Sequence, residues 1–448
     1  MTEYALNLCV PRAPADRHRP LLLMALLSAA ALGACGDSRD LVLSVGGEDG
    51  GTNNGPDGGT NNGPDGGDGS TADESTLTPV QLLGKRLFED TALSEPRGQS
   101  CASCHDAQYA FSGNNGSRIP AVGLGSRPET FGNRNSPTAM YASFSPVFGF
   151  VSEADEQGDI QYTPTGGQFW DGRVAGLAEQ AQRPFLNPRE MNNPDRETVV
   201  AKVREATYAD LFRDVFGATS LDDVDAAYQR LSEAIAAFEQ TDRFHPFSSR
   251  FDRYLRGEGA LSTVETRGFE LFKDPQKGNC ISCHVGNIAS RNPADWLFTD
   301  FTYDNLGVPR NLAIPDNDDP TFFDLGLCRQ EGLASIAPAD FEITSVCGAF
   351  KVPTLRNIEL TAPYAHNGYF TELRDIVRFY VQRDTNPERW YPAAPGGGVQ
   401  MFNDLPDLYR ANVNTTEVPY DRHRGEAPRL NDDEIDAVVA FLKTLTDE

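Results

Sequence analysis

Histidine, methionine and tryptophan are scarce in this chain of 448 residues, with six, five and three copies. Positive charge is also in short supply, because 39 Lys and Arg stand against 65 Asp and Glu, a formal net charge of −26. Binding to nucleic acid or to anionic lipid needs a basic face, so the sequence argues against both. Eight cysteines are too few for a disulfide-built scaffold of this length, and the spacing of each must be read individually.

A long hydrophobic segment is missing from the N-terminal region, where the apolar run covers only residues 21–32. Such a run is too short to span a bilayer, but it follows three arginines and fits an export signal. The run ends in Leu-Gly-Ala-Cys35, which resembles a bacterial lipobox. We expect residues 1–35 to be a lipoprotein-type signal peptide and Cys35 to anchor the exported protein, in the periplasm, to the outer membrane. The alternative is a plain signal peptide with an incidental cysteine.

The next segment, residues 36–76, contains a repeat without the apolar residues needed for a core. Residues 51–58 read GTNNGPDG, and residues 59–66 repeat them letter for letter. A Gly-, Asn- and Asp-rich stretch cannot bury enough surface to offset the entropy of ordering it. We therefore predict a disordered linker here.

A second internal repeat organises the remainder of the chain. The pattern G-x-x-L-F at residues 84–88 leads into C-x-x-C-H at 101–105, and the same two patterns recur at 268–272 and 280–284. A repeat of this kind indicates two related structural units. We expect one domain over residues 77–250 and another over residues 251–448.

The clearest periodic segments are helical. Apolar residues fall at spacings of three and four over 224–238 and over 435–445. The second of these segments begins with Asn431 as an expected N-cap and Glu434 three residues later, which is a capping-box pattern. Pro-, Gly- and Asn-rich loops are expected at 113–137, 155–168 and 390–430. The predicted fold class is all-α and loop-rich.

C-x-x-C-H is the signature of covalent c-type haem attachment, in which both cysteines bond the haem and the histidine binds its iron. The residues concerned are Cys101, Cys104, His105, Cys280, Cys283 and His284. A four-cysteine zinc site or a redox dithiol would use the same cysteines. Neither alternative explains a histidine directly after both pairs, so we predict two covalent haems.

The sixth ligand of each iron distinguishes two classes of protein. An electron carrier has six ligands on both irons, whereas an enzyme leaves one coordination position open for substrate. No histidine lies between His105 and His245, so the first iron has only Met140 and Met191 as conventional soft ligands in its own domain. The second iron has other candidates within reach, which are His366, Met401 and Tyr380.

Over residues 80–446 the chain resembles the bacterial di-haem cytochrome c peroxidase/MauG family, whose fold is a pair of cytochrome-c-like domains. Besides the two haem motifs, the matching stretches are 83–88, 133–138, 169–173, 179–181, 187–191, 351–357 and 361–368. The resemblance implies that the haem on His105 reacts with peroxide.

The resemblance also implies residue roles around that haem. Glu190 matches the distal acid/base, which moves a proton as the O–O bond breaks. Gln180, ten residues earlier and expected on the same helix, matches its hydrogen-bonding partner. Trp170 matches the tryptophan between the haems, with simple core packing as the alternative.

A calcium site between the domains is implied more weakly. Asn135, Thr361 and Pro363 match it, largely through backbone oxygens, which suit a hard cation. His366 is expected to support the haem environment rather than to bind iron.

Two departures from the classical peroxidases bear on mechanism. Residues 106–134 contain no histidine, whereas the family's classical members have one there that caps the resting iron; we therefore expect an open, high-spin first haem. Tyr380 matches the position of the ligand on the second haem, as in the MauG branch, and an oxygen ligand would lower that haem's potential. The alternative is that Tyr380 only packs near the haem, with Met401 or no residue as the ligand.

Two further cysteines, Cys328 and Cys347, lie outside both motifs. In an oxidising compartment a disulfide between them is favoured over two free thiols, and it would fix the loop that precedes Lys351.

The leading function hypothesis is reduction of hydrogen peroxide to water with electrons from a small periplasmic cytochrome c or copper protein. One alternative is a MauG-like oxidase that modifies Trp or Tyr of a partner protein. The other is a non-enzymatic di-haem electron carrier. Analogy with the family suggests a homodimer.

Overall fold

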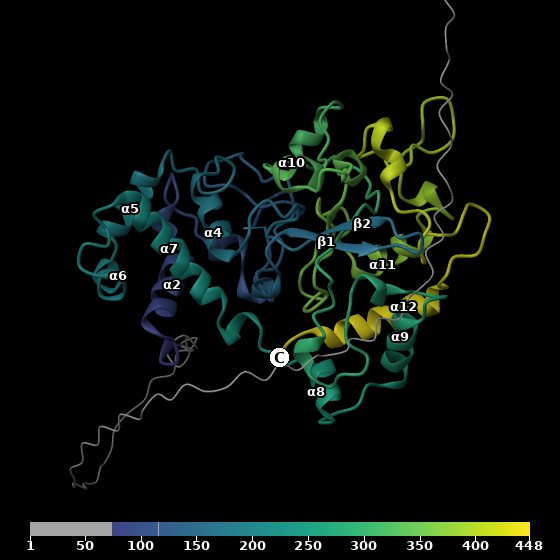
Figure 1. Cartoon of the computed structure of the whole chain (residues 1–448), viewed down its shortest axis with the longest axis horizontal. Coiled ribbons are helices and arrows are strands. Elements are labelled where there is room, and N and C mark those ends of the chain that lie inside the picture. The colour runs from purple at the N-terminus through teal and green to yellow at the C-terminus, as the bar shows by residue number, and fades with distance from the viewer. Residues whose placement is uncertain (1–73, 115) are drawn as a thin grey trace, which may run out of the picture. The chain divides into compact units, whose positions relative to one another are not determined.

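Helices packed around two apolar cores organise the protein in a computed structural model that describes residues 74–114 and 116–448. The helices are α2 Pro79–Glu89, α3 Cys101–Cys104, α4 Leu177–Leu186, α5 Arg196–Glu205, α6 Ala209–Phe216, α7 Val224–Glu239, α8 Arg250–Arg256, α9 Thr263–Lys273, α10 Leu333–Ile336, α11 Leu373–Gln382 and α12 Asp432–Leu442. Loops and short 3₁₀ turns connect them. Figure 1 shows α2 and α4–α7 grouped on one side and α8, α9, α11 and α12 on the other.

The first core forms where α2 crosses α7. Gly84 permits this close crossing, because a Cβ atom at that position would lie 1.9 Å from the carbonyl oxygen of Ala234. Leu83, Leu87 and Phe88 of α2 are fully buried against α7, and burial of such side chains stabilises the fold by about 1.5–3 kcal/mol each.

The second core repeats the first crossing with different helices. A Cβ atom on Gly268 of α9 would lie 1.9 Å from the carbonyl oxygen of Ala437 in α12. Phe272 and Phe441 fill this core, with ring centroids 5.3 Å apart. The sequence repeat at 84–88 and 268–272 is thus a repeat of helix packing.

The long helices predicted from periodicity are confirmed. The segment 224–238 lies within α7, and α12 begins after Asn431, whose side chain accepts a hydrogen bond from the N–H of Glu434. The Glu434 carboxylate accepts from the N–H of Asn431 in return, which completes the predicted capping box.

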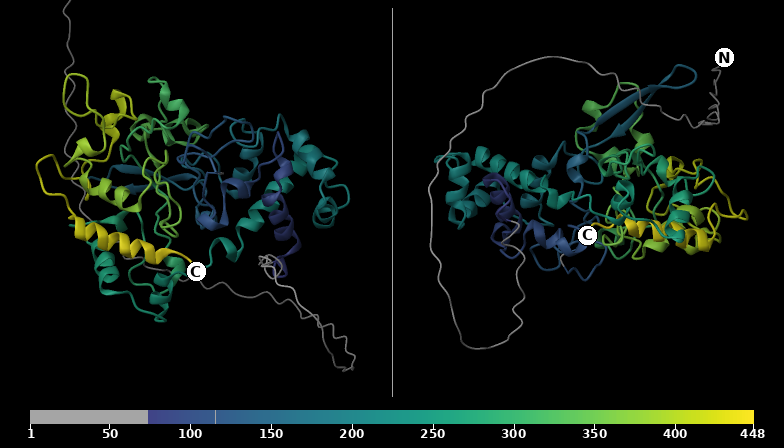
Figure 2. Two further views of the ribbon diagram at one scale, coloured as in Figure 1. Left: turned by 180° about the vertical axis from the view of Figure 1, so that it is seen from behind. Right: turned by 90° about the horizontal axis from the view of Figure 1, so that it is seen from below.

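The protein is mostly helical, but two small sheets depart from the all-α expectation. Strands β1 Gly149–Ala154 and β2 Ile160–Thr165 form an antiparallel hairpin, so the prediction of a loop over 155–168 is wrong for β2. Figure 2 shows this hairpin extending from the body of the molecule. Strands β3 Tyr303–Asp304 and β4 Phe350–Lys351 form the second antiparallel pair.

The predicted leader, Cys35 and nearly all of the predicted linker lie outside the described residues. In the part of the chain that the structure describes, no helix has both the length and the apolar character to cross a bilayer.

Candidate functional site

The first C-x-x-C-H motif places its cysteines on the single turn α3. The following residue, His105, donates a hydrogen bond from Nδ1 to the carbonyl oxygen of Phe111, 2.9 Å away. This contact leaves Nε2 as the nitrogen that can bind a metal. Burial lowers the pKa of His105, and the hydrogen bond to Phe111 only partly offsets this effect. The neutral imidazole suits an iron ligand.

The second motif has the same arrangement. Cys280 begins a 3₁₀ turn, and His284 donates from Nδ1 to the carbonyl oxygen of Phe298 at 3.1 Å. Burial lowers the pKa of His284 to about 4. In both motifs a backbone carbonyl fixes the tautomer and leaves Nε2 for a metal.

A cavity of about 260 Å³ adjoins the second motif and is lined by Cys280, Cys283 and His284. Lys351 also lines it, and burial lowers the pKa of this ammonium group to about 8, while its hydrogen bond goes to the carbonyl oxygen of Gly167.

The imidazole of His366 lines the same cavity and stacks on Phe350, with ring centroids 3.6 Å apart. Its Nε2 is buried without a hydrogen-bond partner among the described residues. The half-buried Lys351 ammonium group and the orphaned His366 nitrogen, beside two thiols and the free imidazole nitrogen of His284, fit a haem with its two carboxylates.

Glu190 lies in the environment of the first motif, since its charge raises the pKa of the Cys104 thiol. The carboxylate accepts a hydrogen bond from Asn187 Nδ2 at 2.8 Å. Burial raises the pKa of Glu190, partly countered by the positive charge of Arg173 and by this hydrogen bond. A half-buried acid with a raised pKa can hold and deliver a proton.

Gln180 and Glu190 do not share a helix, contrary to the prediction. Helix α4 carries the half-buried Gln180 but ends at Leu186, with Asn187 as its C-cap. Pro188 follows directly and has no N–H with which to continue the helix. Glu190 therefore lies in the turn that follows, where its own N–H donates to the carbonyl oxygen of Asn187.

Trp170 joins the wall of the cavity to the segment around Asn135. Its Nε1–H donates to the Asn135 carbonyl oxygen at 2.8 Å, and its own carbonyl accepts from the Lys351 N–H at 2.8 Å. The indole lines the same cavity as His284 and is half-buried. Polar contacts therefore fix the ring between segments that are distant in sequence.

The residues predicted to bind calcium lie close together. Asn135 Nδ2 donates to the carbonyl oxygen of Pro363 at 2.6 Å, and Thr361 lines the same cavity as both residues. A cation at this point would require the amide oxygen, not the nitrogen, to face Pro363. No cluster of three or more His, Cys, Asp or Glu with metal-binding geometry occurs in residues 74–114 and 116–448, so a cation site built here would depend on amide and backbone oxygens.

Tyr380 of α11 lines the cavity of the second motif together with Cys283. Burial raises its pKa well above the ordinary value, and the thiols and Asp304 add to this effect. Met401, the alternative ligand, lies outside this cavity and lines a separate pocket with His423. The placement favours Tyr380 over Met401 as a group facing the second haem.

The two methionines suggested as ligands of the first iron have other contacts in the structure. Met191 is buried in the first core. Met140 lines the cavity of the second motif, and its sulfur accepts a hydrogen bond from Asn357 Nδ2 at 3.3 Å.

Sequence reasoning missed two buried residues at these sites. Tyr420 lines the cavity of the second motif and stacks on Tyr380 with ring centroids 5.7 Å apart. Glu239, at the end of α7, raises the pKa of the Cys101 thiol. Aligning the two repeats over α7 and α12 could have identified Glu239, because the corresponding position holds Leu442.

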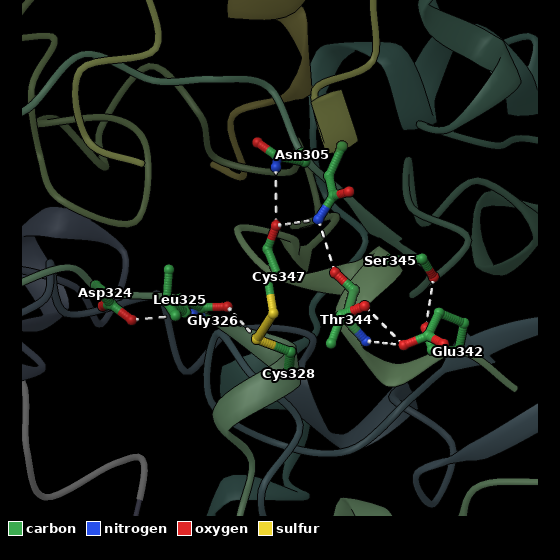
Figure 3. Close-up of a disulfide and its surroundings, with 10 residues drawn as sticks. Asn305, Asp324, Leu325, Gly326, Cys328, Glu342, Thr344, Ser345 and Cys347 are labelled. Carbon is green, nitrogen blue, oxygen red and sulfur yellow. Dashed lines mark hydrogen bonds between the residues drawn. A yellow bond between two sulfur atoms is a disulfide. The ribbon is translucent and has the colours of Figure 1, made fainter. Parts of the chain in front are cut away.

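The predicted disulfide is confirmed. Cys328 and Cys347 are bonded, and Figure 3 shows Asn305 and a second amide group donating to the carbonyl oxygen of Cys347. The bond closes a 19-residue span that ends just before β4, which carries Lys351.

Two cytochrome-like helix crossings, each with a C-x-x-C-H motif and a free imidazole nitrogen, define a protein that carries two c-type haems. Comparison with known proteins identifies the family. The family model described as di-haem cytochrome c peroxidase matches residues 79–260. The methylamine utilization protein MauG of Paracoccus denitrificans is 37% identical over 379 residues, which cover 82% of this chain and 88% of that protein. The cytochrome c551 peroxidase of Nitrosomonas europaea is 29% identical over 367 residues, 81% of this chain and 79% of that protein.

Among solved structures, the diheme peroxidase BthA from Burkholderia thailandensis is similar, with a TM-score of 0.76 and 41% identity over 83% of this chain and 86% of that one. A MauG-like protein associated with microbial copper homeostasis has a TM-score of 0.55 and 25% identity, over 84% of this chain and 92% of that one. The chain belongs to the di-haem cytochrome c peroxidase/MauG family of oxidoreductases.

Proposed function

We propose that the protein reduces hydrogen peroxide to water, with electrons from a small cytochrome c or copper protein. When bound, the two haems supply the redox chemistry and the iron at which peroxide reacts. The observation that carries the proposal is Glu190, a half-buried acid with a raised pKa beside the first haem motif. Cleavage of the O–O bond needs a proton moved from one peroxide oxygen to the other, and Glu190 is the group placed to move it.

Other residues support this reaction by position. His105 and His284 would hold the irons through Nε2, while Lys351 and His366 would provide polar partners for haem carboxylates. Trp170, fixed by Asn135 and Lys351, is suited to pass electrons between the two halves. Gln180 would orient peroxide beside Glu190. A calcium ion held by Asn135, Thr361 and Pro363 would stiffen the segment under Trp170.

The acidic chain favours a donor with a basic docking face. Cys35 would tether the protein, through a lipid, to the periplasmic side of the outer membrane. We propose a homodimer by analogy with the family. Light scattering tests the homodimer by measuring the mass of the particle. Palmitate labelling of wild type and Cys35→Ser tests the lipid anchor.

Replacement of Glu190 tests the reaction. In holo-protein supplied with a reduced donor, Glu190→Gln keeps an acceptor for Asn187 but removes the proton, so kcat for peroxide reduction should fall by about 10²–10⁴-fold. The control is Glu205→Gln, an exposed carboxylate paired with Arg97, which should retain wild-type activity. Unchanged turnover in Glu190→Gln with both haems attached would contradict the proposal, as would wild-type protein that consumes no peroxide.

A second candidate function is oxidation of a partner protein. It is favoured by the 37% identity to a MauG protein and by Tyr380 in the cavity of the second motif. The protein would use peroxide to oxidise a Trp or Tyr side chain of a partner protein. Mass spectrometry of partner proteins after peroxide treatment should then find a modified residue that Tyr380→Phe fails to produce. A non-enzymatic electron carrier would instead give two low-spin ferric signals by electron paramagnetic resonance and no turnover.

A further inference from the structure

Glu239 is a buried carboxyl group to which the peroxide reaction assigns no role. It is the last residue of α7 and is 6% exposed. Burial is the cause that raises its pKa, and no hydrogen bond or cation of the described residues lowers that pKa in return. A buried carboxyl group without such compensation is costly, so its presence calls for an explanation.

The packing repeat places Glu239 beside the first haem motif. Ala234 and Phe238 of α7 meet Gly84 just as Ala437 and Phe441 of α12 meet Gly268. One residue further along, Glu239 therefore corresponds to Leu442. Leu442 lines the cavity of the second motif, so Glu239 occupies the equivalent place beside the first. Independently, the charge of Glu239 raises the pKa of the Cys101 thiol.

The surroundings of Glu239 disfavour a negative charge. The residue lies at the C-terminus of α7, the negative end of the helix dipole. Burial alone raises its pKa to about 8. No cation of the packed helices offsets this, because those cations have other partners.

The partners of those cations can be given helix by helix. On α2, Lys85 binds Glu74 and Glu89, and Arg86 binds Glu74; on α4, Arg183 binds Glu179; on α5, Arg196 binds Asp225, Lys202 binds Glu95 and Arg204 binds Glu197. The ionisable group that faces Glu239 from α3 is Cys101, whose sulfur is taken up by the haem thioether. The other carboxyl group acting on Cys101 is Glu190.

We propose that Glu239 is a proton-carrying residue of the first haem pocket, releasing its proton when an electron leaves that haem and regaining it when the electron returns. Oxidation makes the haem more positive by one charge, which stabilises the carboxylate. Each oxidation would convert the reduced haem and protonated Glu239 into the oxidised haem and the Glu239 carboxylate, with release of one electron and one proton. In the proposed reaction peroxide takes the electron, and the proton enters the water that is formed.

This role is distinct from that of Glu190. Asn187 and Arg173 already stabilise the Glu190 carboxylate, whereas no hydrogen bond or cation of the described residues lowers the pKa of Glu239. The inference rests on a haem attached at Cys101 and not on reactivity with peroxide, so it stands or falls separately from the proposed function.

Spectroelectrochemical titration of the holo-protein at several pH values tests the inference. In the wild type, the reduction potential of the first haem should fall as pH rises, because loss of the electron is coupled to loss of a proton. Glu239→Gln and Glu239→Leu should abolish most of this pH dependence. The leucine is the residue that the second half has at the equivalent position, Leu442. The potential of the second haem should keep its own pH dependence in both variants. Haem content and far-UV circular dichroism establish that each variant is folded.

Two results would overturn the inference: a pH-independent first haem in the wild type, or an unchanged pH dependence in both Glu239 variants. Loss of the dependence in Glu190→Gln alone would assign the proton to Glu190. Redox-induced infrared difference spectra give a direct readout, since a protonated carboxyl C=O band should disappear on oxidation in the wild type and be absent from Glu239→Gln. An unchanged band in Glu239→Gln would also overturn the inference.

Discussion

The two halves of the molecule share a scaffold but surround their haem motifs with different chemistry. Each has a glycine-mediated helix crossing and a histidine whose Nδ1 is fixed by a backbone carbonyl. Beside the first motif lie two acids, the half-buried Glu190 and the buried Glu239. Beside the second lie two phenols, the half-buried Tyr380 and the buried Tyr420. One packing arrangement therefore supports a site flanked by carboxyl groups and a site flanked by aromatic hydroxyl groups.

Arg356 contacts both halves, and its removal should cause the largest loss of stability. The guanidinium binds Asp252 at 2.9 Å with both partners fully buried, and it lies over the rings of Tyr141 and Phe247. Tyr141 belongs to the first core and Asp252 lies on α8 of the second half. Arg356→Ala would leave the buried Asp252 carboxylate with hydrogen bonds from Ser249 but without its cation, so we expect a loss of about 3–5 kcal/mol in the free energy of unfolding.

Denaturant unfolding of the holo-protein, followed by circular dichroism and haem absorbance, measures this loss. The control is Arg374→Ala, which breaks a largely exposed pair with Asp436 and should cost no more than about 1 kcal/mol. Similar losses in the two variants would show that Arg356 does not hold the halves together.

The pH dependence of stability should separate the first half from the second through Glu239. Its pKa is about 8 in the folded protein against 4.5 as the ordinary value. Between these values the folded state binds the proton more strongly than the unfolded state, so the free energy of unfolding falls as pH rises. The loss should reach at most about 5 kcal/mol above pH 8 and should be missing in Glu239→Gln. Chemical denaturation at pH 5 and pH 8 measures it, with Glu205→Gln as the control. An equal wild-type–variant difference at both pH values would refute the assignment.

The equivalence of the two helix crossings can be tested by adding one methyl group to each. Gly84→Ala and Gly268→Ala both drive a Cβ atom against a backbone carbonyl, so each should cost about 2–3 kcal/mol through displaced helices. In Gly259→Ala the nearest heavy atom would be 4.0 Å away, and stability should hardly change. Thermal unfolding compares the three variants, and a harmless Gly84→Ala beside a damaging Gly268→Ala would show that the crossings are not equivalent.

Much of this scaffold could be predicted from the sequence because its signals are local. The 3–4 apolar spacing of α7 and α12, the Asn431 cap and the Cys328–Cys347 pair are all confirmed. The hairpin was missed because most of β1 is exposed, and exposed strands lack the alternation that reveals a buried face. The shared helix for Gln180 and Glu190 was wrong because the spacing was read across Pro188.

The candidate site was harder to predict because its parts meet through tertiary packing. The haem motifs are contiguous in sequence and were found directly. The contact of Asn135 with Pro363 joins residues more than two hundred positions apart, and only family resemblance brought them together. Glu239 gave no local signal at all, since one carboxylate at the end of an amphipathic helix resembles an ordinary surface residue until the two halves are superposed.

The N-caps of the equivalent helices α7 and α12 give the finest comparison and the smallest expected effects. Asp223 accepts from the Ala226 N–H, and Asn431 accepts from the Glu434 N–H, both at 2.9 Å. Asp223→Ala should cost about 1 kcal/mol, because it leaves that donor unpaired and removes a negative charge from the positive end of the helix dipole. Asn431→Ala should cost less, because the Glu434 carboxylate still accepts from the backbone N–H of residue 431. Asp223→Asn keeps the hydrogen bond and should recover most of the loss in thermal unfolding. A larger loss in Asn431→Ala than in Asp223→Ala would mean that the capping box of α12 depends on the asparagine side chain rather than on Glu434.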